Sequence, residues 1–199
     1  MGDAVKTVII LISAYIIGSI PFALIVGKKI GGIDVRNYGS GNLGGTNAFR
    51  ILGWKVGVPV IVADILKGML ATYLGLRLGG ETLGILAGIA AAVGHCYPLF
   101  ANFKGGKGVA VGAGIFLIVA PKVILLAAVM FLLTLFIFRY VSLSSIVGAL
   151  TVGLLTFVYD QSLFLTTLSW LLVIFVIYRH RSNIKRILNG TENKVGYKR

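Results

Sequence analysis

The chain alternates long apolar segments with short polar stretches, a pattern typical of a protein that crosses a membrane several times. A helix perpendicular to a bilayer needs about 20 residues to cross the hydrocarbon core, and most of the apolar segments approach that length. The segment before Pro121 is short, so we expect a short helix starting near Gly105, or a re-entrant one, ending where proline interrupts it. The apolar segments are 5–27, 56–76, 82–100, 109–120, 122–138, 141–159 and 163–178. They predict an all-α, polytopic membrane protein with seven transmembrane helices in one domain, 1–199.

Composition agrees with a membrane protein, because 57% of the residues are hydrophobic and only 13% are charged, whereas soluble domains have about 25% charged residues. The net charge of +13 would suggest nucleic-acid binding in a soluble protein. Most of these cations flank apolar segments, and no soluble domain remains to present a basic face, so we expect no nucleic-acid partner. A single cysteine, Cys96, excludes an internal disulfide and a cysteine-rich metal site.

The distribution of lysine and arginine predicts how the chain is oriented. With seven spans, 15 of the 19 cations fall on one side, and the other side receives only Lys6, Arg77 and Lys122. Six spans would move the basic tail, 179–199, away from the other cationic loops. The positive-inside rule therefore predicts an outside amino terminus and a cytoplasmic carboxyl terminus. We expect 5–27 to stay as the first span, since no small-x-small cleavage site precedes the Lys28-Lys29 pair.

The first polar stretch is residues 39–47, Gly-Ser-Gly-Asn-Leu-Gly-Gly-Thr-Asn, followed by Arg50. Its glycines permit close backbone approach, and exposed N–H groups with nearby cations suit an anionic, phosphorylated ligand. Hydroxyl and amide side chains alternate with these glycines, and Thr46 or Asn47 can cap the following helix. A flexible linker is the alternative, although such linkers tend to be monotonous in Gly and Ser.

The second stretch is Gly94-His95-Cys96-Tyr97-Pro98, followed by Lys104-Gly105-Gly106-Lys107-Gly108. A glycine turn between two ammonium groups can hold a phosphate. The Walker A pattern is absent, and basic loop ends are also expected from topology alone. The predicted orientation places both stretches on the cytoplasmic face.

The histidines and acidic residues offer few candidates for a protein base. His95 and His180 are not followed by aspartate five positions later, so the His–Asp pair of acyl-CoA-dependent glycerolipid acyltransferases is missing. Of six acidic residues, only Asp34, Asp64 and Glu192 fall on the inner side, because Asp3, Glu81 and Asp160 fall outside. Asp64 and Lys67 are spaced i, i+3 within a span; they either satisfy each other or orient the site.

Three motifs together carry a resemblance to a known family. G-S-G-N-x-G-x-T-N at 39–47, G-H-x-Y-P…F-K-G-G-K-G at 94–108 and N-G-T-E at 189–192 resemble the bacterial acyl-phosphate-dependent glycerol-3-phosphate acyltransferases over essentially the whole chain. This resemblance implies a multi-pass protein of the inner (cytoplasmic) membrane. It implies transfer of a fatty acyl group from acyl phosphate to the 1-hydroxyl of sn-glycerol 3-phosphate, giving lysophosphatidic acid and inorganic phosphate. This reaction is the first acylation of bacterial phospholipid synthesis.

We expect direct attack of the glycerol hydroxyl on the acyl carbonyl, with no covalent enzyme intermediate, no cofactor, no metal and no obligate protein partner. Either glycine-rich stretch fits either substrate phosphate, and the acyl chain needs contact with membrane lipids. The residues expected to take part in catalysis are Ser40, Asn42, Lys104, Ser142, His180 and Asn183. Those expected to bind substrate phosphate are Gly41, Gly44, Thr46, Asn47, Arg50, His95, Gly105, Gly106, Lys107 and Gly108.

Two other classes of protein fit part of the pattern. A transporter or channel for a phosphorylated solute would also need anion sites in the membrane, but it predicts polar residues along several spans, and only Asp64 and Lys67 interrupt a span here. A structural membrane subunit would leave the glycine-rich stretches unexplained. The tail motif at 189–192 is either part of the site or a turn that docks the carboxyl end on the loops.

Overall fold

A computed structural model describes residues 2–159 and 161–196, and within these residues the chain forms helices and no strand. Asp160, Lys198 and Arg199, which enter the predicted charge distribution, lie outside the described residues. The contacts group the chain into two compact units, Met1–Val119 and Ala120–Arg199. The prediction of an all-α protein is confirmed; a single domain stays a prediction.

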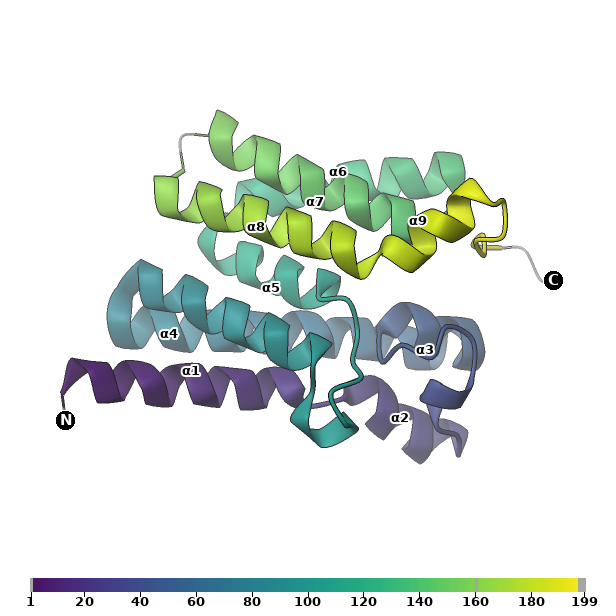
Figure 1. Cartoon of the computed structure of the whole chain (residues 1–199), viewed down its shortest axis with the longest axis horizontal. Helices are drawn as coiled ribbons and strands as arrows, with labels where there is room; N and C mark the ends of the chain where they lie inside the picture. The colour runs from purple at the N-terminus through teal and green to yellow at the C-terminus, as the bar shows by residue number, and fades with distance from the viewer. Residues whose placement is uncertain (1, 160, 197–199) are drawn as a thin grey trace. The chain divides into compact units, whose positions relative to one another are not determined.

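The first unit contains the amino-terminal helices and both glycine-rich stretches (Figure 1). Its first predicted span is broken, since α1 ends at Ser19 and Pro21 directly precedes the next helix. Proline lacks the N–H that would continue the hydrogen-bond ladder. The elements are α1 (Asp3–Ser19), α2 (Phe22–Gly31), η1 (Val35–Asn37), α3 (Gly45–Leu52), α4 (Trp54–Cys96), η2 (Leu99–Ala101) and α5 (Val109–Val119).

Helix α4 contains two predicted spans that fold back on each other. Its backbone leaves the helical conformation at Gly79 and Gly80, and Gly80 has a φ of 78°, which glycine adopts without the steric cost of a side chain. A Cβ at Gly75 would meet the backbone of the second arm at 2.6 Å, at the Leu83 carbonyl oxygen. The two arms therefore run antiparallel, and the turn lies at the end of the unit from which α1 begins (Figure 1).

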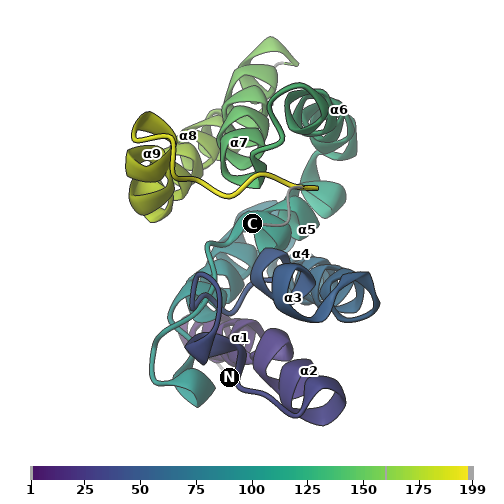
Figure 2. The ribbon, with the colours of Figure 1, turned by 90° about the vertical axis from the view of Figure 1, so that its right-hand side faces the viewer.

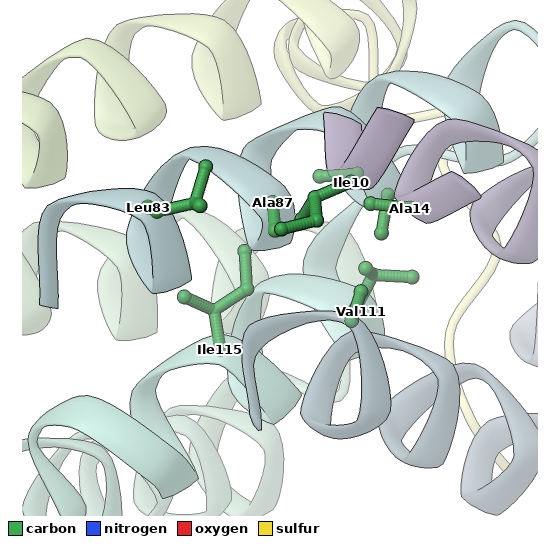
Figure 3. Close-up of a cluster of buried hydrophobic side chains, with 9 residues drawn as sticks. Ile10, Ala14, Leu83, Ala87, Val111 and Ile115 are labelled. Atoms are coloured by element: carbon green, nitrogen blue, oxygen red, sulfur yellow. The ribbon is translucent and has the colours of Figure 1, made fainter. Parts of the chain in front are cut away.

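Small residues let the helices of this unit pack closely. Ile10 and Ala14 of α1, Ala87 of α4 and Ile115 of α5 belong to one buried cluster (Figure 3). At its edge, a Cβ at Gly114 of α5 would overlap the backbone of α4. Interfaces of this kind, in which small residues bring helix backbones together, are common between membrane helices.

The second unit is a series of helices joined by short connections, in which α6 packs on α7 and α7 on α8. The chain bends by 55° between α8 and α9, and Pro121 begins α6, as the sequence predicts. Phe136 on α6 is 85% exposed, as expected for a side chain that faces lipid rather than water. The helices are α6 (Pro121–Phe138), α7 (Val141–Val158), α8 (Leu163–Arg179) and α9 (Arg181–Leu188).

Length and composition identify four stretches of the described residues as candidate spans: Asp3–Gly31, Trp54–Ala101, Pro121–Phe138 and Val141–Val158. The bent pair of α8 and α9 makes a fifth. Helix α5 has 11 residues, or roughly 17 Å at 1.5 Å per residue, against a hydrocarbon core of about 30 Å. The prediction of a short helix here is confirmed, but its start near Gly105 is wrong, because the helix begins at Val109 and Gly105 and Gly106 instead bond to the end of α4. The seven spans and their orientation stay predictions.

Candidate functional site

The first glycine-rich stretch folds as a tight loop that leads into α3. Gly39 and Gly41 have φ values of 60° and 69°, in the left-handed region that favours glycine. Gly44 then occupies the N-cap position of α3, which begins at Gly45. The loop thus brings its polar side chains to the amino end of a helix, where backbone N–H groups lack partners within the helix.

A carboxylate–guanidinium pair supports the chain just before this loop. Asp34 accepts hydrogen bonds from the backbone N–H of Arg36 at 3.0 Å and from its Nη2 at 2.6 Å. The Arg36 side chain lowers the pKa of Asp34 from its ordinary value of 3.8 to about 2. Asp34 is therefore ionised and paired at neutral pH.

The buried side chain of Asn47 hydrogen-bonds to the backbone of the first loop and of the residues just before it. Its side chain is 2% exposed; Oδ1 accepts from Ser40 N–H at 2.9 Å, and Nδ2 donates to the carbonyls of Val35 at 3.1 Å and Tyr38 at 3.2 Å. Both ends of its amide bind the backbone of the loop or of the residues just before it, and the expected contact of Asn47 with phosphate stays a prediction. Its contacts are those of a residue that shapes the loop.

The other predicted polar residues of this stretch are more accessible. Ser40, Thr46 and Arg50 are exposed, and Asn42 is half-buried. The Nδ2 of Asn42 donates to the Ser40 hydroxyl at 3.2 Å. Ser40 and Asn42 therefore present an adjacent hydroxyl and amide at the loop surface, and the exposed Arg50 follows within α3.

The glycine pair of the second stretch packs against the end of α4. Gly105 N–H donates to the Cys96 carbonyl at 3.2 Å, and Gly106 N–H donates to the His95 carbonyl at 3.1 Å. Both glycines are buried, and a Cβ at either one would overlap His95. Their backbone N–H groups thus stabilise the turn itself, and the direct contact with phosphate that the sequence suggested stays a prediction.

The cations that flank this pair are placed differently. Lys104 is exposed, and Lys107 is half-buried directly before Gly108 and the first residue of α5, Val109. The amino end of a helix carries a partial positive charge and attracts anions. Two ammonium groups and a helix amino terminus therefore follow one another along a short segment.

The two glycine-rich stretches lie at the same end of the first unit, away from the Gly79–Gly80 turn (Figures 1 and 2). Leu43 from the first stretch and Ala101 from the second belong to one buried cluster with Val35 and Val60. Packing within the unit therefore holds both loops at one end. The predicted orientation requires this, because it places both loops on the same face of the membrane.

His95 of the second stretch is buried together with two other ionisable side chains, Asp64 and Lys67. Asp64 Oδ1 is 2.9 Å from Lys67 Nζ and 3.4 Å from His95 Nδ1, and all three side chains are at most 6% exposed. Lys67 Nζ also donates to the Ile20 carbonyl at 3.1 Å, at the break between α1 and α2. The spacing of Asp64 and Lys67 allows them either to satisfy each other or to orient the site; the structure adds His95 to the pair.

In the second unit, Glu192 joins two of the predicted catalytic residues. Its Oε1 accepts from Ser142 Oγ at 2.8 Å and Asn183 Nδ2 at 2.6 Å, and its Oε2 accepts from Arg186 Nε at 2.7 Å. Burial raises the pKa of Glu192, but the hydrogen bonds from Asn183, Arg186 and Ser142 outweigh it, so the pKa is lowered overall. The tail turn at 189–192 thus docks an ionised carboxylate on α7 and α9.

His180 lies at the bend between α8 and α9 and is 3% exposed. Its Nδ1 is 2.8 Å from the Val176 carbonyl. A carbonyl oxygen accepts but cannot donate, so Nδ1 carries a proton.

Glu192 organises this group, yet it was not among the site residues predicted from the sequence. In sequence it stands out only as an inner acid within the N-G-T-E motif. The sequence does contain one signal for this role. Gly190 predicts a turn after the basic segment that becomes α9, and such a turn can bring Glu192 back toward the cations of that segment. Its partners Ser142 and Arg186 are 50 and 6 positions away, and such distant pairings are not visible in residue spacing.

Comparison with known proteins gives consistent matches over nearly the whole chain. Residues 8–190 match the family model described as glycerol-3-phosphate acyltransferase. The chain is 52% identical to a glycerol-3-phosphate acyltransferase of Bacillus cytotoxicus over 191 residues, 96% of each protein. It is 51% identical to one of Geobacillus kaustophilus over 189 residues, which are 95% of this chain and 96% of that relative.

Solved structures show a similar fold. The chain matches a crystal structure of PlsY, an integral membrane glycerol 3-phosphate acyltransferase, in its glycerol 3-phosphate form, with a TM-score of 0.91 at 38% identity. The lysophosphatidic acid form of PlsY matches with a TM-score of 0.89 at 37% identity. Each match covers 96% of both chains.

Proposed function

This chain belongs to the glycerol-3-phosphate acyltransferase family, of the PlsY type, and from that premise we propose that its acyl donor is an acyl phosphate. The acceptor named by the family is glycerol 3-phosphate, so both substrates would carry a phosphate. Membership of this enzyme family argues against the two alternatives, a transporter and a structural membrane subunit. The product that we propose is lysophosphatidic acid, the ligand named for one of the PlsY structures.

The two glycine-rich stretches supply the proposed phosphate sites. Lys104 and Lys107 flank a turn that packing and hydrogen bonds hold rigid, so their ammonium groups can meet a phosphate with little loss of backbone freedom. Ser40, Asn42 and Arg50 offer a hydroxyl, an amide and a guanidinium around the first loop. Holding both substrates in position would supply much of the rate enhancement.

The donor assignment rests on one observation, which is that the acidic residues of the inner face are held in ion pairs. Asp34 is paired with Arg36, Asp64 with Lys67, and Glu192 with Arg186. These three are the acids that the predicted topology leaves on the inner face. A reaction that relied on one of them as general base would have to break such a pairing. An acyl phosphate needs no such base, because its leaving phosphate can accept a proton.

The proposed reaction is a single acyl transfer. The 1-hydroxyl oxygen of glycerol 3-phosphate attacks the acyl carbonyl carbon, and the bond from that carbon to the phosphate oxygen breaks. The hydroxyl proton goes to the departing phosphate, so the products are the ester and inorganic phosphate. The cations of the loops stabilise negative charge as it develops, and no acyl group is attached to the protein.

The second unit contributes Ser142, His180 and Asn183 as proposed catalytic residues. Glu192 fixes the side chains of Ser142 and Asn183, and the Val176 carbonyl fixes the His180 ring. Fixed side chains are what positioning of a substrate requires. We place the reaction at the cytoplasmic face of the bacterial inner membrane, which is the side that the positive-inside rule assigns to the cationic loops.

The direct test supplies glycerol 3-phosphate with palmitoyl phosphate or palmitoyl-CoA and measures lysophosphatidic acid and phosphate release. We expect product from palmitoyl phosphate alone, and intact-mass analysis of rapidly quenched enzyme should find no acylated protein. Lys104→Ala should lose activity on the order of a hundredfold, the size expected when a group that positions substrate is removed. Arg77→Ala, which removes an exposed cation beside the Gly79–Gly80 turn, should keep it.

Product from palmitoyl-CoA alone would overturn the donor assignment. An acylated protein that forms and decays at the rate of turnover would overturn the single-step reaction. Equal losses in Lys104→Ala and Arg77→Ala would show that net charge, rather than the second loop, controls the rate.

A further inference from the structure

A chain of buried polar contacts connects the break between α1 and α2 with the turn between Lys104 and Lys107. It begins at the Ile20 carbonyl, which accepts a hydrogen bond from Lys67 Nζ. Lys67 pairs with Asp64, and the same oxygen of Asp64 faces His95 Nδ1. All these groups belong to the first unit.

The chain continues from His95 to the glycine pair. The Gly106 N–H donates to the His95 carbonyl at 3.1 Å. A Cβ at Gly106 would overlap the ring of His95, with Nε2 as its nearest atom. The imidazole therefore lies directly against the backbone of the turn.

The carboxylate of Asp64 determines how the ring is held. Because an ionised carboxylate only accepts hydrogen bonds, the His95 nitrogen that faces it must carry a proton. This contact fixes the ring orientation and leaves Nε2 toward Gly106. Mutual neutralisation would require only Asp64 and Lys67 to face each other; the contact with His95 adds a link from this pair to the second loop.

We propose that Asp64 is a positioning residue for the phosphate site: through His95 it fixes the Gly105–Gly106 turn and thereby the spacing of Lys104 and Lys107. His95 then acts on the substrate through the loop, in place of the direct phosphate contact expected from the sequence. This inference rests on the proposed function of the second stretch as a phosphate site. Lys67 keeps the carboxylate charged and in place within a buried environment.

The variants must break the link without leaving an unpaired buried charge. Asp64→Leu combined with Lys67→Met replaces the ion pair by apolar side chains, an exchange that proteins often tolerate. His95→Phe keeps a ring but removes both nitrogens, with the ion pair intact. Thr72→Val is the matched control, because Thr72 is buried in the same helix and donates only to the Gly68 carbonyl one turn before it.

Two measurements follow these variants. Steady-state kinetics with glycerol 3-phosphate and palmitoyl phosphate should show a rise in KM of about tenfold or more for one of the two substrates, with a smaller change in kcat. Hydrogen–deuterium exchange in peptides covering 101–110 should accelerate by a similar factor. Combining all three substitutions should add little, because residues that act through one contact are not additive.

Unchanged KM values together with unchanged exchange in 101–110 would overturn the proposal. So would an equal effect of Thr72→Val, since general loosening of α4 would then explain the result. If Asp64→Leu/Lys67→Met fails to fold, His95→Phe carries the test. If the wild type does not use palmitoyl phosphate, the donor assignment fails, and the exchange measurement still decides whether Asp64 positions the loop.

Discussion

Asn47 illustrates how one side chain can determine the shape of a polar loop. Its amide satisfies three backbone groups from Val35, Tyr38 and Ser40. In sequence, asparagine among glycines suggests a ligand contact or a helix cap. Its buried contacts with the backbone make it part of the scaffold that presents Ser40 and Asn42, and a contact with phosphate stays a prediction.

We expect Asn47→Ala to destabilise the first loop. Each backbone group left buried without a partner costs about 1–3 kcal/mol, so thermal unfolding in detergent should shift to lower temperature and activity should fall. Asn37→Ala, at an exposed position just before the loop, is the control and should leave both unchanged. A stable Asn47→Ala protein with normal kinetics would show that the loop does not depend on this side chain.

The helices of the first unit meet at glycines, so their spacing depends on the absence of side chains. Gly114 of α5 packs against the carbonyl of Ile65, and Gly68 of α4 packs against the carbonyl of Val111. These reciprocal contacts fix α5 on α4, and α5 begins two residues after Lys107. The position of the second loop therefore depends on backbone packing at both of its ends, through His95 on one side and α5 on the other.

Two glycines in α5 provide a matched pair. Gly114→Ala should destabilise the protein by about 1–3 kcal/mol, since overpacking forces the two helix backbones apart. Gly112→Ala should be neutral or stabilise by about 0.5–1 kcal/mol, because a Cβ there meets nothing within 4 Å and alanine favours the helix. Unfolding midpoints in detergent distinguish them; equal effects of both substitutions would contradict close α4–α5 packing.

The charge distribution concerns the whole molecule. Most cations lie outside the predicted apolar segments, and the positive-inside rule interprets this asymmetry as a signal of orientation. Every predicted apolar segment is helical in the structure, and α4 covers two of these segments. Seven crossings is an odd number, and it would therefore place the two ends of the chain on opposite sides.

Labelling of single cysteines tests that arrangement. In a Cys96→Ala background, we expect the thiol of Asp3→Cys to react with an impermeant maleimide on intact cells. The thiol of Asn193→Cys should react only in inverted membrane vesicles. The wild-type protein should remain unlabelled, because Cys96 is fully buried. Labelling of both positions from the same side would contradict an odd number of spans.

Local sequence patterns alone predict the helical class, the short helix before Pro121, the break between the segments 122–138 and 141–159, and the two glycine-rich stretches. These follow from local properties: apolar runs long enough for helices, a proline that interrupts them, and glycines at polar turns. The break at Pro21 was missed because the apolar run continues through it, and hydrophobicity does not report the loss of one N–H.

The partners of the buried polar residues came only from the folded chain. Asp64 and His95 lie on opposite arms of α4, and Glu192 meets Ser142 across 50 positions. Such contacts form because a polar group removed from water needs a hydrogen-bond partner, and any of several residues in the sequence could supply it. Packing selects that partner, through glycines that set the distance between helices and a turn that folds α4 back on itself.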